Sequence, residues 1–266
     1  MPRKLVWMLA LSLTFLAVVY ASQSVYQRRR AGGLEWEMQN PALDPPDAHE
    51  KGEYTFARLR YRGFRGWGSS WGTDANKSER QFVQGVRRLT RLHTRSVETI
   101  IDVDSDEMYN WPWLYAVEVG HWELSESQAK RLRDYLDRGG FLMVDDFHGT
   151  YEWEVFASSL QRVFPDKQVL ELEDDHQLFH VIYDLEKRFQ VPGRQFLRSR
   201  RTYEDDGVQA RWRAILDDNG RVQVAICHNM DLGDAWEWAD LPQYPEAFAS
   251  LAYRIGVNYI LYSMTH

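Results

Sequence analysis

Residues 141–149, FLMVDDFHG, contain the pattern that decides the fold of this chain. The segment opens with an uninterrupted apolar run, which is typical of a strand buried on both faces of a sheet. A helix is predicted immediately before it, over residues 125–138, because Ser125 and Gln128 form a capping box and a pair of glycines follows. A helix that leads into a buried strand is the repeating unit of a parallel sheet.

The same alternation extends in both directions along the chain. Further strands are expected at residues 54–61, 96–103, 113–119 and 169–172, and further helices at residues 78–93, 152–164 and from Pro245 onward. Residues 208–216 and 221–227 read as a hairpin, because the Asn-Gly pair between them suits a tight turn. We therefore predict an α/β domain with a flavodoxin-like, doubly wound, mainly parallel sheet and an antiparallel hairpin near the C-terminus.

The composition limits the classes of function. A net charge of −7 over 266 residues disfavours a nucleic-acid partner. The single cysteine excludes an intrachain disulfide. An apolar content of 44% is sufficient for a sizeable core.

The N-terminus has the pattern of an export signal. Arg3 and Lys4 precede an uncharged apolar stretch at residues 5–20, and small residues suited to cleavage lie just before Ser22. An uncleaved membrane anchor is the alternative, and both readings stay open. We expect a signal peptide or anchor at residues 1–22, a linker at 23–53 and one α/β domain at 54–266, located in the periplasm or anchored to the membrane outside the cytoplasm.

Three predicted strands end in polar residues. Gly120-His121 follows one strand, Asp145 and the rest of DDFHG follow a second, and residues 227–234, CHNMDLGD, follow a third. Ligands of open α/β sheets bind just beyond the carboxyl ends of the strands. These segments therefore predict a polar cleft at that edge of the sheet.

The candidate catalytic residues come from these strand ends. They are Asp146, His148, His121 and His228. Asp146 and His148 lie two residues apart, so they share one face of an extended segment. Together with His121 they are also the candidate ligands of a divalent metal. A proton-transfer or hydrogen-bonding cluster without metal is the alternative, and a third reading makes the aspartates helix caps.

The candidate binding residues are more widely spread. They are Arg58, Arg60, Trp71, Asp145, Asn229, Asp231 and Asp234. Arg58 and Arg60 share one face of the first strand and meet either an anion or the carboxylates of this chain. Trp67 and Trp71 lie in a glycine-rich loop and are candidates for stacking on a sugar.

Several longer segments resemble one bacterial family. FARLRY at residues 56–61, DDFHG at 145–149, NMDLGDAWEW at 229–238 and GVNY at 256–259 are similar to the domain-of-unknown-function family numbered 4159. The resemblance implies a class I glutamine amidotransferase-like fold, and it implies no reaction. Its members are often found beside ATPases and von Willebrand A-type proteins, which implies an envelope assembly.

One residue departs from the chemistry of those fold neighbours. They use a cysteine nucleophile on a Gly-x-Cys-x-Gly turn, whereas Cys227 has no flanking glycine. Amidotransferase chemistry is therefore not expected, and Cys227 reads as a small buried residue at a strand end.

Two functions follow from these patterns. The first is a ligand- or partner-binding module of the bacterial envelope, with a small molecule, a glycan or an envelope protein as partner and the N-terminal segment at the membrane. The alternative is a hydrolase, metal-assisted or metal-free, that uses the Asp/His cluster. The sequence leaves open whether the protein is an enzyme.

Overall fold

The computed structural model describes residues 43–48, 50–63 and 70–266. The predicted signal or anchor at residues 1–22, most of the linker and Trp67 lie outside the described residues. Within the described ranges, no helix is long and apolar enough to cross a membrane.

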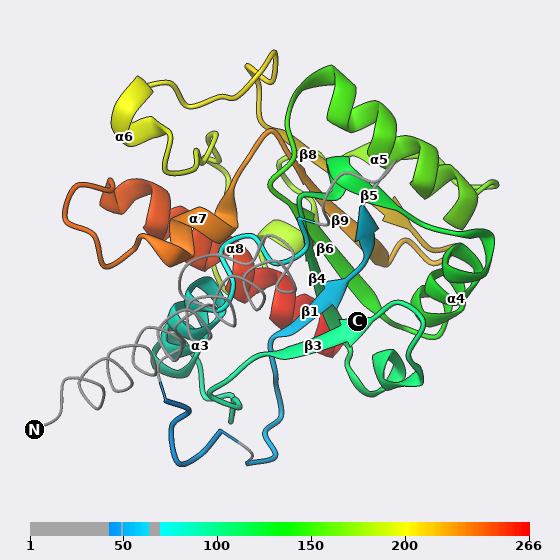
Figure 1. The fold of residues 1–266 in the computed structure, drawn as a ribbon, viewed down its shortest axis with the longest axis horizontal. Helices are drawn as coiled ribbons and strands as arrows, with labels where there is room; N and C mark the ends of the chain where they lie inside the picture. Colours follow the sequence, from blue (N-terminus) through cyan, green and yellow to red (C-terminus); the bar gives the residue numbers. More distant parts are fainter. Residues whose placement is uncertain (1–42, 49, 64–69) are drawn as a thin grey trace, which may run out of the picture.

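A seven-stranded sheet forms the centre of the molecule, in the order β3-β1-β4-β6-β9-β8-β7 (Figure 1). Its strands are β1 (Ala57–Arg60), β3 (Thr99–Asp102), β4 (Trp113–Val117), β6 (Phe141–Asp145), β7 (Leu170–Glu171), β8 (Arg211–Leu216) and β9 (Val222–His228). The first five strands of that order run parallel, and β8 pairs antiparallel with both β9 and β7. The predictions of a mainly parallel α/β sheet and of a late antiparallel hairpin are confirmed.

Helices cover both faces of this sheet (Figure 1). One face packs against α3 (Lys77–Leu89), α7 (Leu232–Glu237) and α8 (Glu246–Thr265), and the other against α4 (Glu126–Asp137) and α5 (Gly149–Val163). The short elements are β2 (Arg62–Gly63), β5 (Trp122–Glu123), α6 (Phe196–Ser199) and the 3-10 turns η2 (Asp106–Asn110), η3 (Val119–His121) and η4 (Gln177–Phe179). Each face therefore has its own apolar core, and the strands between them are buried on both sides.

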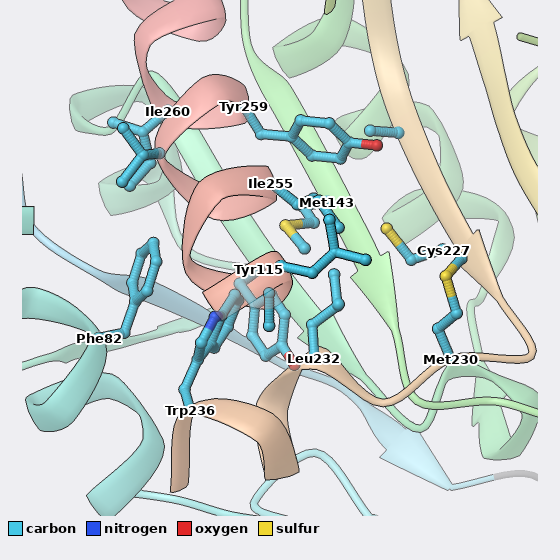
Figure 2. Close-up of a cluster of buried hydrophobic side chains, with 14 of the residues drawn as sticks. Phe82, Tyr115, Met143, Cys227, Met230, Leu232, Trp236, Ile255, Tyr259 and Ile260 are labelled. Atoms are coloured by element: carbon cyan, nitrogen blue, oxygen red, sulfur yellow. The ribbon is translucent and has the colours of Figure 1, made fainter. Parts of the chain in front are cut away.

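The core on the α8 side joins the strands to the C-terminal helix. Figure 2 shows Tyr115 of β4, Met143 of β6 and Cys227 of β9 facing Trp236 of α7 and Tyr259 of α8. Cys227 is fully buried, and burial raises the pKa of its thiol well above the usual range. The side chain therefore has the environment of an unreactive core cysteine.

The largest difference from the expected elements is α7. The sequence predicts no helix there, because six residues are too few to show a helical period. The side chain of Asp231 begins the helix by accepting a hydrogen bond from the Asp234 amide at 2.7 Å. The capping box of α4, by contrast, is present as predicted.

Candidate metal centre

An acidic cavity of about 260 Å³ lies at the carboxyl edge of the sheet. It is bordered by the segments that follow β4, β6 and β9 and by the loop before α3. Most of the residues that line it are acidic, namely Asp74, Glu118, Asp146, Glu204, Asp231, Asp234 and Glu237. Such a concentration of carboxylates in one small cavity is electrostatically costly unless a cation or protons compensate it.

The backbone around this cavity takes an uncommon conformation. Asp74, Glu118 and Asp146 have φ angles of 62°, 54° and 51°, and Asn229, which follows β9, has a φ of 64°. Non-glycine residues seldom occupy the left-handed region, and those that do are concentrated at functional sites. The backbone therefore adopts a conformation of higher free energy at these residues, and this conformation directs their side chains.

Three aspartates form the centre of the cavity. Asp74, Asp146 and Asp231 are all buried, and each has a carboxylate oxygen within 4.8 Å of the others. Burial raises the pKa of all three well above the usual range, and the charges of neighbouring acidic residues raise it further. Hard oxygen ligands at this spacing suit Mg²⁺, Mn²⁺ or Ca²⁺. A divalent cation would replace the repulsion among these buried carboxylates with attraction to its own charge.

Asp74 owes its position to a buried arginine. The guanidinium of Arg58 donates to the carbonyls of Trp71 and Thr73, each at 2.9 Å, and pairs with Glu79. Both charged side chains of that pair are fully buried. Arg58, a predicted binding residue, therefore lies beneath the site and fixes the loop that carries Asp74.

One oxygen of Asp74 has no hydrogen-bond partner. Its Oδ2 atom is buried and unpaired with respect to all the residues that the structure describes. A Cβ at Gly233 would lie 2.6 Å from this oxygen, so only glycine lets α7 approach it so closely. A buried carboxylate oxygen without a donor calls for an explanation, and a bound ion is one.

Asp146 and His148 meet in the structure. His148 Nε2 lies 3.2 Å from Asp146 Oδ1 and 3.9 Å from an oxygen of Glu204. His148 Nδ1 is buried with no hydrogen-bond partner in the described part of the chain. Carboxylates that bind metals are usually oriented by hydrogen bonds from other residues, and the Nε2–H tautomer of His148 would supply one to Asp146.

Asp145 points away from the cavity, although it adjoins Asp146. Its Oδ2 accepts hydrogen bonds from the Tyr115 hydroxyl and from the amides of Leu232 and Gly233, at 3.0, 2.7 and 2.9 Å. Burial raises the pKa of Asp145 to about 7. This residue attaches the start of α7 to the sheet and thereby positions Asp231 and Asp234.

His228 and Asn229 hold the start of α5. Arg213 donates to His228 Nδ1, so the Nε2–H of His228 donates to the Gly149 carbonyl at 3.1 Å. Asn229 Oδ1 accepts from the Gly149 amide at 2.8 Å. Burial lowers the pKa of His228 to about 4, so its ring is neutral near pH 7.

His121 lies in a separate group from the metal ligands expected with it. Its ring is held between Glu118, 2.6 Å from Nδ1, and Glu152, 3.2 Å from Nε2. The hydrogen bond to Glu118 raises the pKa of His121. The structure thus groups His121 with Glu118 and Glu152, and it groups Asp146 with Asp74 and Asp231.

Arg60 and Trp71 border a different and larger cavity, of about 660 Å³, beyond β1 and β3. Arg60 forms an exposed ion pair with Asp102, with both contacts at 2.5 Å, and its guanidinium lies 5.7 Å from the Trp71 ring centre. These two predicted binding residues are therefore placed apart from the aspartate group.

Four acidic residues of the cavity are not among the residues predicted from the sequence, namely Asp74, Glu118, Glu204 and Glu237. Asp74 lies at the end of the loop whose tryptophans are the candidates for stacking on a sugar. A usable signal was present, since an Asp-Ala-Asn segment precedes the α3 helix and polar residues there usually cap or bind. Glu237 lies within the motif at residues 229–238, between Trp236 and Trp238.

A comparison with family models finds one match over nearly the whole domain. Residues 55–264 match the family described as "Domain of unknown function (DUF4159)". No curated protein matches the chain.

Proposed function

The chain belongs to the DUF4159 family, and we propose that its domain is a divalent-cation-dependent binding module. Asp74, Asp146 and Asp231 would hold the cation, and the cation would bind an oxygen-bearing ligand in the cavity. This assigns a cation to the polar cleft that the sequence places at the carboxyl edge of the sheet.

One observation carries the proposal. The three aspartates bring oxygens within 4.8 Å of one another while all three side chains are buried. Ion pairs elsewhere neutralise carboxylates with arginine, as Arg58 does for Glu79. Among the described residues, no lysine or arginine forms an ion pair with any of these three aspartates. A cation from solution is the simplest compensation for their charge.

Elemental analysis tests the proposal. The purified chain is incubated with Mn²⁺, desalted and compared with Asp146→Asn and Asp231→Asn, while Glu204→Gln serves as a matched acidic control at the cavity wall. Full retention of Mn²⁺ by the parent and the control, with less Mn²⁺ retained by both aspartate variants, supports the centre. Equal retention in all four proteins, or none in the parent, contradicts it. Thermal unfolding of each variant in EDTA shows whether the fold is retained.

Metal-assisted hydrolysis is the second candidate function. The contact of His148 with Asp146, beside Glu204, favours it, because an imidazole next to a cation-bound water is a suitable proton acceptor. A panel of chromogenic phosphate and carboxylate esters tests this with Mn²⁺ and with EDTA. Hydrolysis that needs Mn²⁺ and is lost in His148→Gln, while Mn²⁺ is still bound, supports an enzyme. Cation binding without turnover of any ester favours the binding module.

We also propose that the domain has a flavodoxin-like fold and that the protein is exported from the cytoplasm. The order β3-β1-β4-β6-β9 of the parallel strands corresponds to the flavodoxin-like order 2-1-3-4-5, which supports that fold and the related amidotransferase-like grouping.

The basic and then apolar pattern of residues 3–20 supports export, with a glycan, small molecule or envelope protein as partner. Fractionation of cells that produce the full chain, with N-terminal sequencing of the product, tests location and cleavage together.

A further inference from the structure

We propose that the cavity holds two divalent cations and that the carboxylate of Asp74 bridges them. The second cation would be held by Asp74, Asp234 and Glu237. This inference rests on the proposed function, because it adds a second site to the one formed by Asp74, Asp146 and Asp231.

The geometric basis is a residue shared by two groups. Asp74, Asp234 and Glu237 each offer a carboxylate oxygen, and these oxygens lie within 4.8 Å of one another. The same limit holds for Asp74, Asp146 and Asp231. A carboxylate has two oxygens, so one residue can belong to both groups and bridge two ions. In two-metal sites the ions are about 3.5–4 Å apart, a separation that one carboxylate can span.

The unpaired oxygen of Asp74 is the independent observation. The side chain of Asp74 is buried, at 4% exposure, and lines the cavity. Its Oδ2 has no hydrogen-bond partner within the described ranges. A buried carboxylate oxygen that no donor satisfies costs free energy unless something binds it.

A second feature is the space left at Gly193. A Cβ there would lie 2.2 Å from Asp231 Oδ2, 2.7 Å from Asp234 Oδ2 and 3.0 Å from Gln195 Oε1. The absence of a side chain at this position therefore lets oxygens of both groups converge. The amide oxygen and nitrogen of Gln195 are also buried without partners among residues of known placement.

The negative charge of the residues that line the cavity favours the binding of more than one cation. Arg194 is the basic residue on that wall, and its guanidinium stacks 4.4 Å from the Trp238 ring centre. No described carboxylate forms an ion pair with Arg194. One divalent ion has two positive charges, whereas seven acidic residues line the cavity, and a second ion would share Asp74 with the first.

Manganese binding tests the inference in two ways. Isothermal titration of the full chain with Mn²⁺ gives the number of sites, and electron paramagnetic resonance of the loaded protein reports whether two Mn²⁺ ions are coupled. The variants are Glu237→Gln, which alters only the second group, and Asp146→Asn, which alters only the first. Glu204→Gln is the control, since Glu204 lines the cavity and belongs to neither group.

We expect two Mn²⁺ ions per chain and a coupled spectrum for the parent and for Glu204→Gln. We expect one ion and an uncoupled spectrum for Glu237→Gln and for Asp146→Asn. One ion in the parent overturns the two-cation inference and leaves the proposed function standing, whereas no ion in the parent overturns both. Two coupled ions in Glu237→Gln would show that Glu237 is not a ligand and overturn this assignment. If a variant does not fold, the stoichiometry and spectrum of the parent still decide between one ion and two.

Discussion

Asp74 and Asp231 come from loops far apart in the sequence, one before α3 and one before α7, yet their carboxylate oxygens lie within 4.8 Å of each other. Each is also tied to its own anchor. Arg58 fixes the loop of Asp74, and Asp145 fixes the start of α7 beside Asp231. The approach of two buried acids is therefore built into the fold from both sides.

The Arg58–Glu79 pair should dominate the stability of the Asp74 loop. Removal of one member leaves a buried, unpaired charge, so Arg58→Met or Glu79→Gln should cost about 3–5 kcal/mol in the free energy of unfolding. Urea unfolding followed by circular dichroism measures this cost. The double variant Arg58→Met/Glu79→Leu should recover most of it, because no charge then stays unpaired. A cost below about 1 kcal/mol for the single variants would show that the pair contributes little.

Gly193→Ala should weaken cation binding without unfolding the domain. The new Cβ would lie 2.2 Å from Asp231 Oδ2, so the aspartate must move away from the other ligands. We expect Mn²⁺ affinity to fall about tenfold or more, which corresponds to about 1.4 kcal/mol or more. Isothermal titration measures the affinity, and thermal unfolding in EDTA serves as the fold control. Unchanged affinity would mean that the oxygens near Gly193 take no part in binding.

Asp145→Ala and Asp145→Asn should separate positioning from charge. Alanine leaves the Tyr115 hydroxyl and two amides of α7 without their acceptor, at a cost of about 2–4 kcal/mol. Asparagine retains an acceptor oxygen, so it should keep the start of α7 in place and preserve Mn²⁺ binding. Chemical unfolding and Mn²⁺ titration of both variants check this. Equal losses in the two variants would mean that the charge of Asp145 matters rather than its hydrogen bonds.

His228 should make the free energy of unfolding depend on pH. Its pKa is lowered from 6.5 to about 4 in the fold, so the unfolded chain takes up a proton at a higher pH than the folded chain does. The contribution is fully present above pH 6.5, is lost progressively as the pH falls from 6.5 to about 4, and amounts to about 3 kcal/mol in total.

His228→Gln should remove this dependence, because glutamine does not titrate and can still accept from Arg213 and donate to Gly149. Unfolding free energies from pH 7.5 to 4 measure the difference between parent and variant. His93→Gln is the control, since the side chain of His93 is 60% exposed. A parent and a His228 variant with the same pH profile would contradict the assigned neutral ring.

Much of the fold could be predicted from the sequence because apolar periodicity and helix caps are local signals. The run at residues 141–144 gives β6, and the Ser125 capping box gives α4 at nearly its observed bounds. The start of α7 could not be predicted in this way. Its six residues show no helical period, and its position depends on hydrogen bonds from the Leu232 and Gly233 amides to Asp145 at the end of β6, which lies far away in the sequence.

The candidate site was predictable only where it follows a strand directly. The motifs at residues 145–149 and 229–238 contain Asp146, Asp231 and Asp234, which the structure places on one cavity wall. Asp74 enters from a loop whose position depends on Arg58, and that contact joins residues on β1 to the segment before α3. His121 was expected beside Asp146, but the tight turn after β4 pairs it with Glu118 and Glu152 instead.

The cation centre is tested most directly by the stability of Asp74→Asn with and without metal. Because Asp74 has a buried oxygen without a donor, loss of its charge should leave the melting temperature in EDTA unchanged or raised. Addition of millimolar Mn²⁺ should raise the melting temperature of the parent by several degrees and leave the variant unchanged. If Asp74→Asn melts well below the parent in EDTA, and Mn²⁺ shifts neither protein, the aspartates are structural and the cation centre is wrong.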